Sequence, residues 1–141
     1  LAWKNKPSDE RKPLIVNGAR QVGKTYTLRR FGAEQFRNVV YVNLEANQTV
    51  ASFFEADITP DRLIRYLESA TGEKITPGET LIILSLPRRT GSFSTRSCRR
   101  AAVLLSSELL SNGSSFAGVV LKCQKKAMPS SPFLSTWNLL L

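Results

Sequence analysis

Residues 14–28, with the sequence LIVNGARQVGKTYTL, constrain the fold of this chain more than any other stretch. They contain the pattern G-x-x-x-x-G-K-[ST] at residues 18–25, in which a glycine-containing loop wraps around phosphate groups. The apolar run at residues 13–17 is typical of a buried strand, and residues 26–36 follow with helical spacing. The sequence therefore predicts a strand, a phosphate-binding loop and a helix in succession, with Gly32 predicted to break or cap that helix.

Each residue type in the pattern suits phosphate binding. Gly18 permits a tight turn out of the strand, and Gly23 lets the backbone close around a phosphate without an intervening Cβ. Lys24 is predicted to bridge the β- and γ-phosphates, and the hydroxyl of Thr25 is predicted to ligate Mg²⁺. The loop amides and the N-terminal end of the helix would donate to the same anion. The predicted site comprises nine consecutive residues: Gly18, Ala19, Arg20, Gln21, Val22, Gly23, Lys24, Thr25 and Tyr26.

Several of these assignments have a simpler alternative. A chance match to the motif in 141 positions has odds of about 1 in 200 from average residue frequencies. Arg20 and Gln21 could contact nucleotide or a neighbouring subunit, but solvated loop side chains are the favoured interpretation. Tyr26 is expected to pack on the helix rather than stack on adenine. Glu45 could polarise a water, although a solvated acid at the end of a strand is favoured.

The following segments alternate between strand and helix patterns. Further apolar runs at residues 38–45 and 80–84 predict two more strands. Helical spacing fills residues 51–72 between them, with Thr59 as N-cap before Pro60 and Gly72 as the stop. Because the strands are continuously apolar rather than alternating, a parallel sheet covered on both faces is predicted. This is an α/β arrangement.

The composition excludes several classes of site. The chain has no histidine, which excludes a histidine general base and a conventional zinc site. Cys98 and Cys123 are too few for a disulfide framework and lack metal-ligand spacing, so a reducing cytoplasm is the expected location. No apolar run approaches the roughly 20 residues that span a bilayer, and no basic-then-apolar leader is seen. A membrane partner is therefore not expected.

Four segments together resemble a family of prokaryotic AAA-superfamily ATPases, in which a P-loop domain precedes a C-terminal domain of poorly defined role. They are KPLIVNGARQVGKTYTLRRFG, NVVYVNLEAN, DITPDRLIRYLE and KITPGETLIIL, and they cover about residues 3–84. The resemblance implies a three-layer αβα P-loop NTPase core with a parallel sheet, in which the strand at residues 80–84 lies beside the P-loop strand. It also implies the cofactors ATP and Mg²⁺, with their phosphate and metal contacts made by Gly18, Gly23, Lys24 and Thr25.

The sequence departs from that family directly after Leu84. The family has an Asp-Glu pair there, whose aspartate holds Mg²⁺ through water and whose glutamate activates the attacking water. This chain has Ser85, Leu86 and Pro87 instead, and the next acid is Glu108. The family's later sensor and arginine positions have no counterpart that we can place. We therefore expect an incomplete core that binds ATP·Mg with doubtful hydrolysis, and we assign no catalytic residue.

The composition changes at the same point. Residues 1–84 contain 12 basic and 10 acidic side chains, whereas residues 85–141 contain 8 basic and 1 acidic. The second part is also rich in serine, arginine and leucine, which each have six codons. A shifted reading frame is the favoured explanation, and a genuinely divergent tail is the alternative. We therefore divide the chain into part of a P-loop ATPase domain, residues 1–84, and a divergent or out-of-frame basic tail, residues 85–141.

The basic tail leaves two other functions open. Its arginines could bind nucleic acid non-specifically, and its residues 99–110 could form a helix, but unselected sequence would contain the same features. Selective nucleic-acid recognition is therefore not expected. The other alternative is a non-functional truncated fragment. Under the favoured interpretation the partner is a nucleotide, with a second copy of the chain or another protein as a further partner class. The tail arginines that could contact nucleic acid are Arg88, Arg89, Arg96, Arg99 and Arg100.

Overall fold

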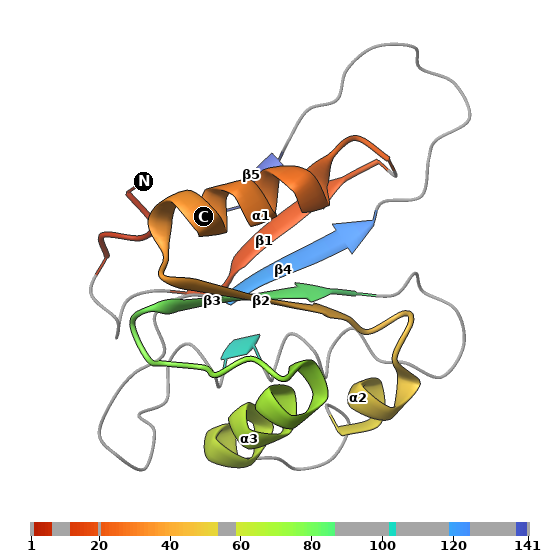
Figure 1. Cartoon of the computed structure of the whole chain (residues 1–141). Coiled ribbons are helices and arrows are strands. Elements are labelled where there is room, and N and C mark those ends of the chain that lie inside the picture. The colour runs from red at the N-terminus through yellow and green to blue at the C-terminus, as the bar shows by residue number, and fades with distance from the viewer. Residues whose placement is uncertain are drawn as a thin grey trace.

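The computed structural model describes residues 2–6, 12–19, 21–53, 59–86, 102–103, 119–124 and 138–140. Helices and strands alternate along the first part of the chain (Figure 1). The elements are β1 (Leu14–Gly18), α1 (Lys24–Gln35), β2 (Asn38–Asn43), α2 (Gln48–Phe53), α3 (Pro60–Thr71), β3 (Thr80–Ser85), β4 (Val119–Gln124) and β5 (Asn138–Leu140).

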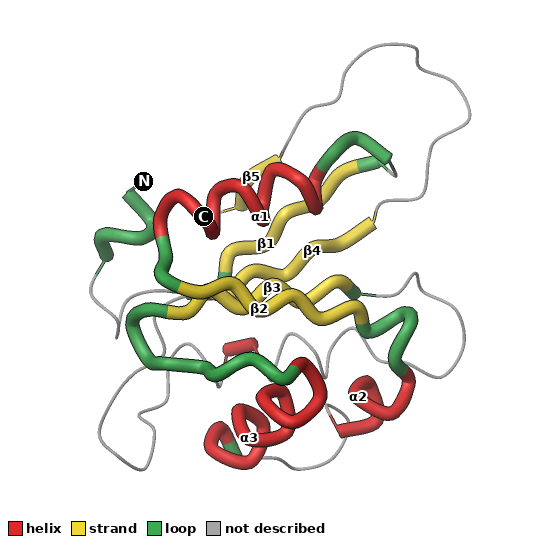
Figure 2. The backbone as a smooth tube through the Cα atoms, viewed as in Figure 1, coloured by secondary structure: helices red, strands yellow, loops and turns green. Residues whose placement is uncertain are grey.

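The strands form one five-stranded sheet in the order β2-β3-β4-β1-β5. The first four strands are mutually parallel, and β5 pairs antiparallel with β1. Helix α1 covers one face of the sheet, and α2 and α3 lie on the opposite face (Figures 1 and 2). This three-layer arrangement confirms the predicted fold class, an incomplete α/β core of the P-loop type.

One prediction about the sheet is wrong. Strand β3, expected beside the P-loop strand, is separated from β1 by β4. The register of β4 runs from Val120, opposite Leu14, to Gln124, opposite Gly18, and its other edge pairs with β3. The sequence VVLKCQ of β4 starts with β-branched residues, but it lies in the segment that composition marked as a tail. The two valines at the start of β4 are the local signal for this strand.

Alternate side chains of β3 face opposite layers, because successive residues of a strand point to opposite faces. Leu81 and Ile83 belong to the core beneath α1, and Ile82 and Leu84 belong to the core beneath α3. All four are fully buried, as expected for a strand covered on both sides. The α1-side core also contains Trp3, Leu14, Val16, Leu28, Phe36 and Val120.

Helix α1 continues through Gly32, so the prediction that this glycine breaks or caps the helix is wrong. Gly32 is buried, and a Cβ placed on it would lie 2.5 Å from Cγ2 of Val39 and 3.1 Å from Cδ2 of Leu81. The missing side chain thus lets α1 lie close to β2 and β3. The helix ends at its C-cap, Phe36, whose N–H donates to the carbonyl oxygen of Gly32.

Helix α3 begins and ends where its sequence signals predict. Thr59 is the N-cap and Pro60 the first helical residue, although the Thr59 side chain makes no capping hydrogen bond. Gly72 ends the helix with φ 72°, and its N–H donates to the carbonyl oxygen of Glu68. A positive φ of this kind favours glycine. The helix buries Leu63, Ile64 and Leu67 against the sheet.

Other sequence predictions fall mainly outside the described residues. Of residues 99–110, which could form a helix, only residues 102–103 are described; both are helical, and Ala102 is buried in the α3-side core. Cys98, Glu108 and the five tail arginines are not among the described residues, and of Cys123 only the backbone is described. None of the helices in the described segments is long and apolar enough to cross a membrane.

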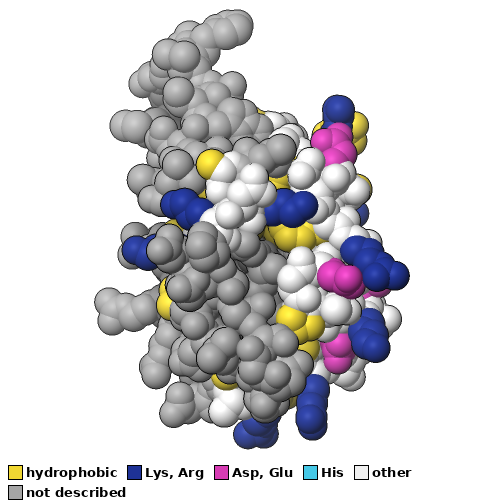
Figure 3. Space-filling view, turned by 90° about the vertical axis from the view of Figure 1, so that its left-hand side faces the viewer, with side chains coloured by type: hydrophobic (Ala, Val, Ile, Leu, Met, Phe, Trp, Pro, Cys, Tyr) yellow, Lys and Arg dark blue, Asp and Glu magenta, His cyan; other side chains and the backbone are white. Residues whose placement is uncertain are grey.

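Where the face drawn in Figure 3 belongs to described residues, basic and acidic side chains lie beside one another along one side. Two exposed ion pairs are Arg30 with Glu34, 2.8 Å apart, and Arg37 with Glu79, 3.4 Å apart. Exposed pairs of this kind contribute little to stability, about 0–1 kcal/mol each.

Candidate phosphate-binding site

The loop between β1 and α1 has the backbone geometry of an anion cradle. Gln21 has φ 61° and Gly23 has φ 79°, and such left-handed residues turn successive N–H groups toward one side. Gly23 is also the N-cap of α1, which therefore has no side-chain capping bond. The first-turn amides have no acceptor from a capping side chain, and the positive end of the helix dipole lies at the same place.

Lys24 folds back over the loop. The residue is 4% exposed, and its Nζ donates to the carbonyl oxygen of Gly18 at 2.9 Å and also to that of Ala19. A Cβ on Gly18 would lie 3.3 Å from Cδ of Lys24, so glycine at this position makes room for the lysine stem. Burial, and to a smaller extent repulsion from Lys122, lowers the pKa of Lys24 from its ordinary value.

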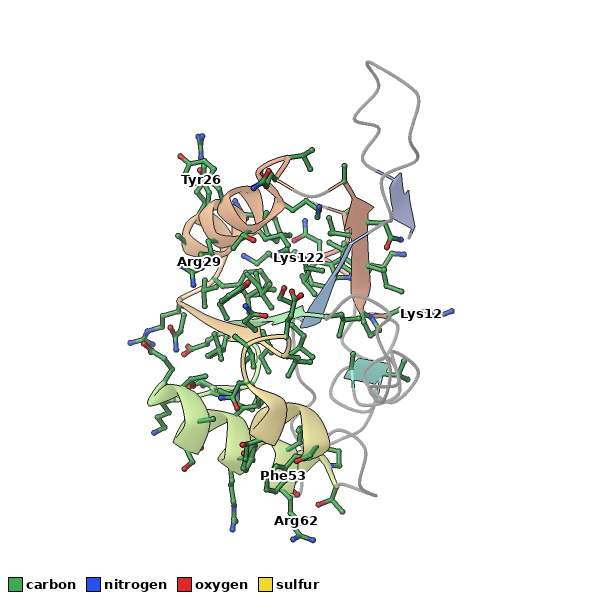
Figure 4. The ribbon with its side chains drawn as sticks, turned by 90° about the vertical axis from the view of Figure 1, so that its right-hand side faces the viewer. Lys12, Tyr26, Arg29, Phe53, Arg62 and Lys122 are labelled. Atoms are coloured by element: carbon green, nitrogen blue, oxygen red, sulfur yellow. The ribbon has the colours of Figure 1, made fainter. Side chains whose placement is uncertain are left out.

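A second lysine reaches the same site from β4. Nζ of Lys122 donates to Oγ1 of Thr25 at 2.6 Å, and it lies 5.8 Å from the centre of the Tyr41 ring. Figure 4 shows Lys122 between α1 and the sheet. Register places Lys122 directly opposite Ser85 of β3. The site therefore combines residues from α1, β2, β3 and β4.

Tyr41 contacts Ser85, Lys122 and Thr25 on the α1 side of the sheet. Burial alone would raise the pKa of its phenol. Hydrogen bonding with Ser85, the positive charge of Lys122, and hydrogen bonds with Lys122 and Thr25 outweigh burial and lower that pKa. The guanidinium carbon of Arg29 lies 4.5 Å from the centre of the Tyr41 ring, so the ring contacts cations from α1 and β4.

For the remaining residues of the predicted site, the structure mainly shows how exposed each one is. Tyr26 is 70% exposed and points away from the sheet (Figure 4). Its side chain is hydrogen-bonded with Arg30, one turn further along the same helix. Gln21 is exposed, which agrees with the expected solvated side chain; Ala19 is also exposed, and Val22 is half-buried. Arg20 is outside the described residues.

Glu45 is too far from the loop to assist phosphate chemistry. It is exposed and follows β2, which is separated from β1 by β3 and β4. Three strand spacings correspond to roughly 14 Å. The favoured interpretation, a solvated acid at a strand end, agrees with this position.

Sequence reasoning missed Lys122 and Tyr41. Lys122 lies 97 residues from its partner Thr25, and no local pattern predicts that contact. The sequence does contain a local signal: residues 119–124 begin with two valines, as strands often do, and include one lysine, Lys122. Tyr41 is at the centre of the second predicted strand, where an aromatic residue is typical of the core.

Comparison with known families agrees with this geometry. The model of the AAA domain family matches residues 10–84, which include β1, the loop, α1, β2, α2, α3 and nearly all of β3. The chain belongs to the AAA domain family. Searches of the curated proteins and of the solved structures gave no match. Membership of this family indicates nucleotide binding by a P-loop domain.

The described residues fit nucleotide phosphates better than they fit Mg²⁺. Uncapped helix amides and two ammonium groups suit an anion. Mg²⁺ prefers carboxylate and other oxygen ligands, but the hydroxyl of Thr25 already accepts from Lys122. Among the described residues there is no cluster of three or more acidic, cysteine or histidine side chains that could hold a metal ion. The assignment of Thr25 as a metal ligand stays a prediction.

Proposed function

We propose that this chain binds an adenine nucleotide through the nine predicted site residues, with its phosphates on the β1–α1 loop. The observation that supports this most is the position of Lys24, which is buried at the start of α1 and directed over the loop. In the bound state, its ammonium would exchange the carbonyl oxygens of Gly18 and Ala19 for phosphate oxygens. Charge-assisted bonds to phosphate are stronger than those to a neutral carbonyl.

Negligible hydrolysis is part of the same proposal. Phosphoryl transfer needs a positioned water and compensation of the charge that develops on the phosphate. Ser85 and Leu86 stand where the resembled family has its two carboxylates, and Leu86 is buried in the α3-side core. The function we propose is therefore nucleotide binding in the cytoplasm, with a second copy or another protein as the partner that responds to it.

Replacing Lys24 tests the proposed binding. Lys24→Ala removes a charge-assisted contact worth about 1.5–3 kcal/mol, so ADP affinity should fall about 10- to 150-fold. Titration calorimetry with ADP measures this. Lys12→Ala is the matched control, because Lys12 is exposed and points away from the sheet (Figure 4). Equal ADP affinity in the Lys24→Ala variant and the unmodified chain would contradict the assignment.

A further inference from the structure

The cation closest to the predicted metal ligand belongs to the chain itself. The ammonium of Lys122 lies 2.6 Å from Oγ1 of Thr25, the atom that the sequence motif assigns to Mg²⁺. A metal ion bound to that oxygen would have to share it with the ammonium of Lys122. It would then lie next to two ammonium groups, those of Lys122 and Lys24, which repel a dication.

The backbone holds Lys122 in this position from both sides. Its strand pairs with β1 and β3, so that Lys122 is opposite Val16 in one register and Ser85 in the other. Its carbonyl oxygen also accepts from the N–H of Leu86 at 3.0 Å. Val120, two residues earlier and so on the same face, is fully buried in the α1-side core. The side chain of Lys122 is therefore directed to the face on which the loop lies.

The two lysines lack acidic partners in the described part of the chain, where the ion pairs are Arg30–Glu34 and Arg37–Glu79. Lys24 is bonded to carbonyl oxygens and Lys122 to a hydroxyl. Two ammonium groups that are bonded only to neutral acceptors at one loop favour binding of a multiply charged anion, because an ammonium bonds more strongly to an ionised acceptor than to a neutral one. The diphosphate group of a nucleotide has that charge.

We propose that Lys122 takes the place of Mg²⁺ at this site, so that the chain binds nucleoside diphosphates and triphosphates without a metal ion. This inference rests on the proposed nucleotide binding. In the complex, the ammonium of Lys122 donates to a phosphate oxygen while keeping its bond to Thr25. Lys24 contacts the same phosphates from the start of α1. Nucleotide binding is then insensitive to chelators.

Titration calorimetry with ADP, in excess EDTA and in excess Mg²⁺, tests the proposal on the whole chain. We expect the two dissociation constants to agree within about threefold. Lys122→Met should weaken ADP binding in EDTA about 10- to 100-fold, because it removes a charge-assisted bond. Lys122→Arg, which keeps the charge, should retain most of the affinity. Lys12→Met is the matched control for loss of one positive charge and should bind as the unmodified chain does.

The outcomes separate this inference from the function on which it rests. Binding of ADP by the unmodified chain in Mg²⁺ but not in EDTA would overturn the inference and leave nucleotide binding intact. Absence of binding in both conditions would overturn both. Full EDTA affinity in Lys122→Met would overturn the role of Lys122 alone. Circular dichroism of each variant checks that the sheet is retained, and the comparison of EDTA with Mg²⁺ in the unmodified chain needs no variant.

Discussion

Two neighbouring residues, Ser85 and Leu86, point to opposite layers of the molecule. Ser85 is 3% exposed and hydrogen-bonded with Tyr41 on the α1 side. Leu86 is 1% exposed and belongs to the α3-side core. A carboxylate at position 85 would therefore face Lys122 and the loop, whereas a carboxylate at position 86 would enter an apolar core. A carboxylate introduced at position 85 could therefore act at the site, whereas one introduced at position 86 would chiefly affect the core.

We predict that the chain as it stands releases negligible phosphate from ATP. Loss of a general base typically costs about 10²–10⁴ in rate, and Ser85 and Leu86 stand where the resembled family has its two carboxylates. A steady-state phosphate-release assay measures turnover, with Lys24→Ala as the control for contaminating activity. Robust release by the unmodified chain that disappears in that control would contradict the prediction.

Substituting the two positions separately should change the stability of the chain by very different amounts. Ser85→Asp places its carboxylate beside the ammonium of Lys122, so we expect a small change in the midpoint of thermal unfolding. Leu86→Glu removes a fully buried apolar side chain and buries an ionisable one, which should destabilise the chain by about 3 kcal/mol or more. Similar unfolding midpoints for the two variants would show that the assignment of faces is wrong.

At the scale of elements, the position of α1 depends on its contact with β2. The buried Gly32 lies against Val39 of β2, with no room for a methyl group. Gly32→Ala should improve helix propensity by about 1 kcal/mol, but the Cβ would lie 2.5 Å from Cγ2 of Val39. Overpacking of this kind costs about 1–3 kcal/mol, so we expect net destabilisation and a shift of α1.

Chemical denaturation measures this effect, and a double variant supplies the control. Val39→Ala makes space beside Gly32, so Gly32→Ala should cost less in that background than in the unmodified chain. Equal costs of Gly32→Ala in both backgrounds would show that the helix and strand are not in close contact. Such non-additivity is expected only between residues that touch.

The elements that could be predicted from sequence are those with local signals. The run of buried residues in β3 and the Thr59, Pro60 and Gly72 signals of α3 are sufficient to locate both elements. The loop residues of the site follow from their motif for the same reason. Strand β4 and Lys122 could not be predicted in this way, because their positions depend on pairing between residues 37 to 106 positions apart, from Ser85 with Lys122 to Leu14 with Val120.

At the scale of the whole molecule, the segment after Leu84 contributes two strands to the sheet. Strand β4 lies between β1 and β3, and β5 pairs with β1. The division at residue 84 and the shifted reading frame stay predictions, which resequencing of the coding DNA across the Leu84–Ser85 junction tests directly. Either way, the basic charge concentrates in residues 85–141.

We predict that this charge does not give selective nucleic-acid recognition. Binding through Lys and Arg to phosphates weakens steeply with salt, so retention on duplex DNA should be lost between about 50 and 150 mM salt. Two duplexes of equal length and different sequence, compared by fluorescence anisotropy, measure it. A preference for one sequence that persists at about 150 mM salt would contradict the prediction.

The central claim is that nucleotide phosphates lie on the backbone amides of the β1–α1 loop. Amide hydrogen exchange with and without ADP tests this claim most directly, because it reports each segment of the backbone separately. We predict that ADP slows exchange in residues 18–26 and leaves exchange in α3, on the opposite face of the sheet, unchanged. Protection that appears in α3 and is absent from residues 18–26 would contradict the account.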